Sequence, residues 1–109
     1  MKIPGDAIIP AEKFTHYLLV EREYDDKSKF LSIAGFNNSN YEKLISEIKI
    51  LINKYEASKG KSSDFGTFYT VTGSIIGINK ISLNVATVWI KRNIDNKFQF
   101  ITLIPERRD

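Results

Sequence analysis

The sequence of 109 residues has no cysteine and a single histidine. Without cysteine the chain has no disulfide framework, no thiol nucleophile and no cysteine-based zinc site, and one histidine is too few for an ordinary zinc site. A Gly-rich phosphate loop is missing too, because Gly60-Lys61-Ser62 lacks the upstream glycine of that motif. We therefore predict that the protein holds no metal and no cofactor.

Long apolar runs are also absent, and none approaches the roughly 20 residues that a membrane-spanning helix needs. The first residues, Met1 to Asp6, lack the apolar core of a signal peptide. Together with the lack of cysteine, these features predict a cytoplasmic protein with no membrane association. The length suits one domain, so we expect residues 1–109 to form a single domain, with a helical half at about 10–58 and a sheet half at about 65–105.

Basic side chains exceed acidic ones only slightly. The 16 basic and 13 acidic residues give a net charge of +3 and a pI of about 9.1. A dedicated DNA-binding protein usually has a stronger basic signature. The composition therefore permits RNA or another protein as a partner without requiring either, and it leaves monomer and homodimer open.

Apolar residues in the first half recur with helical spacing. The pattern predicts helices at about 10–20 and 26–34, and a third that begins after a capping box formed by Ser39 and Glu42. Asp25 or Asp26 can cap the second helix, and Gly35 can close it in the left-handed conformation. The third helix carries the longest apolar stripe: Tyr41, Leu44, Ile45, Ile48, Leu51, Ile52 and Tyr55. We expect Gly60 to end it.

After a linker at Lys59–Ser63 the period changes to that of strands. We expect strands at 67–72, 81–91 and 98–104, a turn at Gly73–Lys80, and a short fourth strand near Ala7–Ile9. The apolar residues of 81–91 change parity along the strand, which predicts a β-bulge near Ala86–Thr87. The predicted fold is α+β, with two or three N-terminal helices packed on a C-terminal antiparallel meander of three to four strands.

One face of the long strand combines polar and aromatic side chains. Thr87, Trp89 and Lys91 alternate on one side, with Thr102 predicted to lie across from them. Such a face can stack a base and neutralise a phosphate, which favours Trp89, Lys91 and Arg92 as ligand-binding residues. The alternative is an ordinary strand with Trp89 in the core and Lys91 in solvent.

Metal-independent RNA cleavage needs a proton acceptor and cations around the phosphate. His16 is the only histidine, the residue type that titrates near neutral pH, although a histidine on a helix surface is commonly just solvated. Lys27 stands at the predicted start of a helix, where its charge opposes the helix dipole, so a role at a site is plausible. The candidate catalytic residues are Lys27, His16, Tyr69, Thr87, Lys91 and Thr102.

Several short motifs occur in a recognisable order: Lys13-Phe-Thr-His-Tyr17-Leu-Leu19, Lys27-Ser-Lys-Phe30, Gly35-Phe36, Phe65-Gly66-Thr-Phe-Tyr69, Thr87-Val-Trp89-Ile-Lys91 and Phe100-Ile-Thr102-Leu-Ile-Pro105. On these motifs the chain resembles a small bacterial family of domains of unknown function. The layout is also distantly similar to the barnase, EndoU, colicin and RelE group of ribonuclease toxins. The resemblance implies a toxin-like fold, and fold alone does not carry function.

The stretch before Lys27 differs from the pattern that this resemblance implies. The family often has a His-Pro pair and a glycine ahead of the corresponding lysine, whereas this chain has Arg22-Glu-Tyr-Asp-Asp26. This difference favours a non-catalytic binding or interaction module. The alternative is a metal-independent RNA-cleaving enzyme, and a second alternative is a structural subunit that pairs with its copy through the sheet edge.

Overall fold

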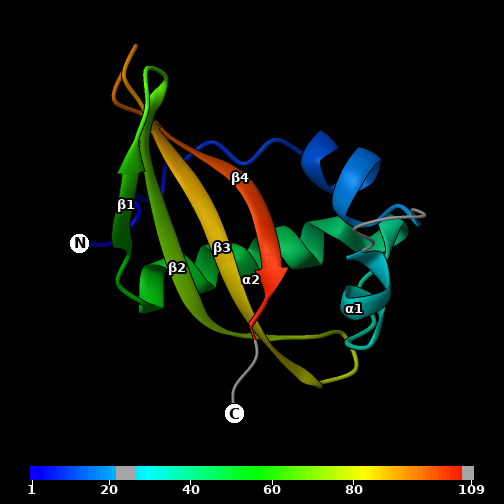
Figure 1. Cartoon of the computed structure of the whole chain (residues 1–109). Helices are drawn as coiled ribbons and strands as arrows, with labels where there is room; N and C mark the ends of the chain where they lie inside the picture. Colours follow the sequence, from blue (N-terminus) through cyan, green and yellow to red (C-terminus); the bar gives the residue numbers. More distant parts are fainter. Residues whose placement is uncertain (22–26, 107–109) are drawn as a thin grey trace.

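The computed structural model describes residues 1–21 and 27–106 (Figure 1). Helical elements come first and strands follow, as the sequence predicts. In chain order the elements are a π-helix η1 (Phe14–Leu18), helix α1 (Ser28–Ser32), a 3-10 helix η2 (Asn38–Asn40), helix α2 (Tyr41–Lys54), and strands β1 (Ser58–Ser62), β2 (Gly66–Ile76), β3 (Ser82–Arg92) and β4 (Phe98–Pro105).

The four strands form one antiparallel sheet in the order β1-β2-β3-β4, which confirms the predicted α+β meander. Helix α2 runs behind the sheet in Figure 1, and η1 and α1 lie beyond the β4 edge. The expected strand near Ala7–Ile9 is a single parallel bridge between Ile8 and Gln99. Among the residues that the structure describes, α2 covers one face of the sheet and no helix lies over the other.

Helix α2 forms where the longest apolar stripe predicts it. Leu44, Ile48, Leu51 and Ile52 are buried because they recur on the side that faces the sheet. The capping box lies two residues earlier than predicted. The Asn37 side chain accepts from Ser39 N at 2.9 Å, while the Asn40 side chain accepts from Asn37 N at 2.8 Å.

The two shorter helices are also close to their predicted positions. In η1, the Leu19 N–H donates to the Phe14 carbonyl, a wider turn than that of an α-helix. Gly35 has a φ of +85°, so it adopts the left-handed conformation predicted after α1. The proposed caps Asp25 and Asp26 lie outside the described residues.

The predicted linker at Lys59–Ser63 is wrong, because residues Ser58–Ser62 form strand β1. All five residues of β1 are exposed, and the strand pairs with β2 along only one edge. A sequence of serine, lysine and glycine has weak strand propensity, but a lysine-rich edge strand is a common way to discourage pairing with other chains. Helix α2 accordingly ends at Lys54, well before Gly60.

The predicted turn at Gly73–Lys80 begins too early, since β2 continues through Gly73 to Ile76. A Cβ on Gly73 would lie 2.5 Å from the Tyr55 ring and 2.8 Å from Leu51. Glycine is therefore needed here because the end of α2 packs directly onto the strand. The turn itself occupies residues 77–81.

The predicted bulge is also misplaced. Strand β3 pairs with β2 in one unbroken register. The irregularity lies on β4, where Val88 pairs with Thr102 and Trp89 with Phe100, so Ile101 is the extra residue. The core-facing side chains of β3 stay on alternate positions from Leu83 to Trp89. Val88 and Ile90, which suggested the change of parity, lie on the other face of the sheet.

Candidate functional site

Trp89 and Thr87 lie on the covered face of the sheet, in the hydrophobic core. Both are 0% exposed. The Trp89 indole Nε1 donates to the Thr87 hydroxyl at 2.8 Å, and that hydroxyl donates to the Val71 carbonyl at 3.0 Å. Trp89 also meets the Phe100 ring edge-on at 5.3 Å. The prediction that Trp89 and Thr87 present a polar-aromatic face to a ligand is therefore corrected: their polar groups bond each other inside the core.

The other candidates on this part of the sheet are Tyr69, Lys91 and Arg92, and they do not form one site. Tyr69 is 8% exposed and packs against Phe98. Lys91 is half-buried, with its ammonium 6.0 Å from the centre of the Phe98 ring. Arg92 reaches the β3–β4 turn, where it pairs with Asp95 and donates to Gln99 at 3.0 Å. Lys91 and Arg92 point to opposite sides of the sheet by strand alternation.

Two predicted residues that are 75 positions apart in the sequence do meet. The Lys27 ammonium, at the start of α1, donates to the Thr102 hydroxyl of β4 at 3.1 Å. Both residues are partly exposed. A lysine beside a threonine hydroxyl at the surface can hold an anionic oxygen, because the ammonium carries a positive charge and the hydroxyl has a proton to donate.

The bulge on β4 is what places Thr102 at this position. Without an extra residue at Ile101, the pairing of Trp89 with Phe100 would carry Thr102 opposite the buried Thr87. With it, Thr102 lies opposite Val88, on the face that α2 does not cover. The bulge therefore turns a residue that would join the core toward solvent and toward Lys27.

Tyr17 is a third member of this site, and it was not among the candidates. The centre of its ring lies 5.8 Å from the Lys27 ammonium, within the range of a cation–π contact. Tyr17 appeared in the sequence only as part of an apolar stripe, and the structure shows it half-buried beside Lys27. His16, the neighbouring residue of η1, is exposed.

The uncovered face extends from this site across the sheet (Figure 1). Thr102, Val88 and Thr70 form one cross-strand row, and Gln99, Ile90 and Phe68 form the next. Most of these side chains are half-buried rather than enclosed. The face is thus a shallow surface of hydroxyl, amide and apolar groups, with Lys27 at its β4 edge.

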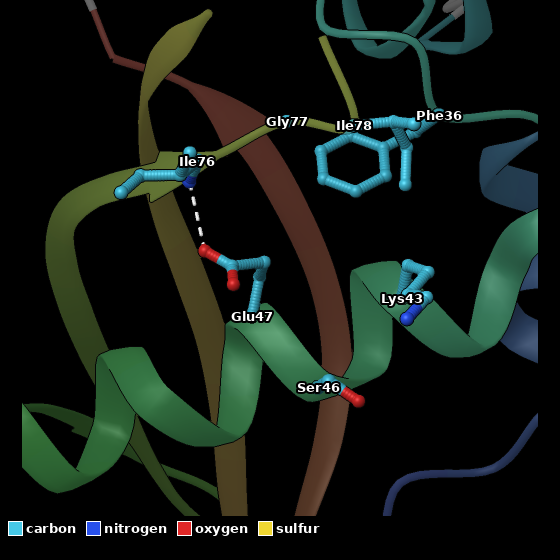
Figure 2. A pocket seen from close by; sticks show the side chains of 7 residues that line it. All are labelled: Phe36, Lys43, Ser46, Glu47, Ile76, Gly77 and Ile78. Atoms are coloured by element: carbon cyan, nitrogen blue, oxygen red, sulfur yellow. Dashed lines mark hydrogen bonds between the residues drawn. The ribbon is translucent and has the colours of Figure 1, made fainter. Parts of the chain in front are cut away.

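Figure 2 shows a separate hollow between α2 and the end of β2, with a volume of about 440 Å³. Glu47 points across it and accepts a hydrogen bond from the Ile76 N–H at 2.8 Å. Lys43 and Ser46 lie further along the same helix, and Phe36 and Ile78 close the opposite side. The carboxylate is engaged in joining helix to strand, which is a structural role.

Within residues 1–21 and 27–106, no three His, Asp or Glu side chains gather in a way that could hold a metal ion. No helix in the same part of the chain is long and apolar enough to cross a membrane. The candidate site is formed by Lys27, Thr102 and Tyr17.

The family model of a "Domain of unknown function (DUF6883)" matches residues 4–107. The chain belongs to this family. No curated protein matches its sequence. Among solved structures, the fold is similar to a chain of a contact-dependent growth inhibition toxin–immunity protein complex from Klebsiella pneumoniae 342.

That similarity has a TM-score of 0.64 and covers 94% of this chain and 96% of the other. The two sequences are 18% identical, so the likeness concerns the fold. It agrees with the resemblance to toxin folds noted from the sequence motifs. That complex contains a toxin and its immunity protein, so the neighbouring structure is one in which two proteins bind each other.

Proposed function

We propose that this domain is a toxin-type module that acts on RNA, cleaving the phosphodiester without a metal ion. The observation that carries the proposal is the hydrogen bond from Lys27 to Thr102 beside the Tyr17 ring on the uncovered side of β4. The fold similarity to a chain of a toxin–immunity complex supports the toxin-type setting.

The geometry suits a phosphate flanked by a nucleoside. Lys27 donates one N–H to Thr102 and offers its positive charge to a non-bridging oxygen of the phosphate. Because the Thr102 oxygen accepts from Lys27, the hydroxyl proton is left to bond a second oxygen. The Tyr17 ring supplies an aromatic surface next to the phosphate.

The proposed reaction is an internal transfer whose nucleophile belongs to the RNA itself. The ribose 2′-oxygen attacks the adjacent phosphorus as solvent water accepts its proton, and the bond to the 5′-oxygen breaks as that oxygen takes a proton from solvent water. The products are a 2′,3′-cyclic phosphate and a free 5′-hydroxyl. Lys27 and Thr102 stabilise the extra negative charge on the phosphorus oxygens while five bonds are present.

A second function is favoured by the burial of other candidates. Thr87 and Tyr69, two of the six candidate catalytic residues, lie in the core. A site with fewer reacting groups fits a module that binds RNA without cutting it. Binding and cleavage use the same cation and hydroxyl, and they differ in whether the strand is broken.

The test is an incubation of the purified protein with total RNA in EDTA, followed by end-group analysis of the fragments. We expect cyclic phosphate ends, and a fall of about 10²-fold or more in rate for Lys27→Met and for Thr102→Val. Lys29→Met is the matched control, because Lys29 is an exposed lysine on the same short helix.

Each outcome separates the two functions. Cleavage that Lys27→Met and Lys29→Met leave equally intact would exclude this site. The non-catalytic module would be established if wild type binds RNA without cutting it and Lys27→Met weakens that binding. Circular dichroism of each variant checks that the half-buried Lys27 position tolerates methionine.

A further inference from the structure

The tips of the β1–β2 and β3–β4 hairpins lie together at the end of the sheet furthest from the β2–β3 turn (Figure 1). Each tip exposes a large apolar side chain to solvent. Phe65 is 81% exposed and Ile94 is 89% exposed, the highest values among the large apolar residues that the structure describes. They flank a recess of about 330 Å³ whose apolar wall includes Ile90.

Hydrogen bonds join the two tips, although their apolar side chains are in water. Asn93 ties them together: its N–H donates to the Phe65 carbonyl at 3.0 Å, and its side chain donates to the Asp64 carbonyl at 3.1 Å. Ser63 braces the first tip, with its hydroxyl accepting from the Phe65 N–H at 3.2 Å.

The second tip has its own network. Asp95 accepts from the Arg92 guanidinium and from the Lys97 N–H, and Arg92 also donates to Gln99. The polar groups of Arg92 and Asn93 are thus bonded within the hairpins, which leaves the recess mainly apolar. These bonds restrain the backbone that carries Phe65 and Ile94, which lowers the entropy that the loops lose on binding.

The same two hairpins account for the net positive charge of the sequence. Residues 59–65 and 90–97 carry five basic and two acidic side chains, a net charge of +3. The whole chain has a net charge of +3, so the rest of the sequence is balanced. An apolar recess between two hairpins of net positive charge complements an acidic surface that carries an apolar side chain.

We propose that the hairpin tips are a docking surface for an acidic protein partner, which inserts an apolar side chain between Phe65 and Ile94. An apolar side chain fits the recess better than a nucleotide base, because the Arg92 guanidinium and the Asn93 amide are already bonded within the hairpins. The surface is separate from Lys27 and Thr102, and the proposal stands whether or not the domain cleaves RNA.

The test uses NMR of the isotope-labelled full chain with defined probes. The first probe is a short synthetic peptide of aspartate and glutamate with one central phenylalanine, and its control has alanine in place of the phenylalanine. Further probes are a single-stranded uridine oligomer and vesicles containing phosphatidylserine, and light scattering measures self-association. Phe65→Ala and Ile94→Ala change exposed residues, so neither should unfold the protein.

We expect the phenylalanine peptide to shift the amide signals of Phe65, Asn93 and Ile94 and to saturate. Its affinity should fall about tenfold or more in Phe65→Ala, in Ile94→Ala and for the alanine peptide. Ile50→Ala, an exposed isoleucine of α2, should bind as wild type does. The proposal is overturned if the two peptides bind equally or neither saturates, or if RNA, vesicles or a second copy occupies the tips while the peptide does not.

Discussion

Side chains along each strand alternate between the two faces of the sheet, and the two faces differ in how deeply those side chains are buried. On β3, Val85, Thr87 and Trp89 are fully buried, while the alternating Val88 and Ile90 are half-buried on the other face. Both sets contain apolar and β-branched residues. Hydrophobicity alone therefore does not say which face is the core; the position of α2 does, because the helix covers only one side (Figure 1).

The largest expected difference between the faces is at adjacent residues. Trp89→Ala removes a fully buried ring and its hydrogen bond, and should lower the free energy of unfolding by about 3–5 kcal/mol. Ile90→Ala, one position along, should cost no more than about 1 kcal/mol. Urea denaturation of both variants measures this, and equal costs would mean that the uncovered face is packed as tightly as the core.

A methyl group added to each face gives the next contrast. Gly73→Ala places a Cβ 2.5 Å from the Tyr55 ring, so we expect a loss of stability of up to about 3 kcal/mol as α2 is pushed away. Gly60→Ala on exposed β1 meets only the Phe68 carbonyl at 3.4 Å, and should change stability by less than about 0.5 kcal/mol. Thermal unfolding distinguishes the two, and a tolerated Gly73→Ala would contradict the close approach of α2.

Removing one hydroxyl from each face is a finer comparison. Thr87→Val leaves the Trp89 indole N–H and the Val71 carbonyl without their buried partner, which should cost about 2 kcal/mol. Thr102→Val acts at a partly exposed position where water can replace the lost contact, so its cost should be less than about 0.5 kcal/mol. If Thr102→Val lost as much stability as Thr87→Val, a fall in RNA cleavage by that variant could not be ascribed to the missing hydroxyl.

Much of the fold follows from local patterns. The stripe from Leu44 to Ile52 predicts α2 because a helix repeats every 3.6 residues and the sheet takes its apolar side. Gly35 marks the end of α1 because it alone there needs a positive φ. These features depend on neighbours in sequence, so a single sequence contains the information.

The errors lie where distant parts of the chain decide. Strand β1 has the composition of a linker, and it forms a strand because its backbone pairs with the edge of β2. Gly73 resembles a turn residue, and it sits in a strand because Tyr55 packs against it. Neither contact is visible from residues near each position, since the partner is on a different element.

The candidate site shows both situations. Lys27 and Thr102 could be chosen from the sequence, one by its place at a helix start and the other by its strand. Their meeting depends on the extra residue Ile101, and the change from buried Phe98 and Phe100 to buried Leu103 is the signal that could have located it. The sequence left two interpretations of Trp89 open because its strand is apolar on both sides, and the structure confirms the one that places Trp89 in the core.

The smallest expected effect concerns the hairpin tip, where acid should act on one contact before it acts on the core. The hydrogen bond from Arg92 chiefly, and that from the Lys97 N–H, lower the pKa of Asp95. A carboxylate whose pKa is lower in the folded protein stabilises it above the pKa of the unfolded chain, and this contribution is lost as the pH falls through the folded value. Because the pair is exposed, the change should be local and modest.

The measurement is the pH dependence of the Asn96 and Lys97 amide signals, compared with that of the Trp89 indole. In wild type the tip signals should shift only as the pH falls below the ordinary pKa of an aspartate, while the indole signal stays in place. Asp95→Asn should remove that dependence, since its amide cannot ionise and bonds Arg92 less strongly at every pH. If the variant kept the wild-type titration, another carboxylate would be organising the tip in place of Asp95.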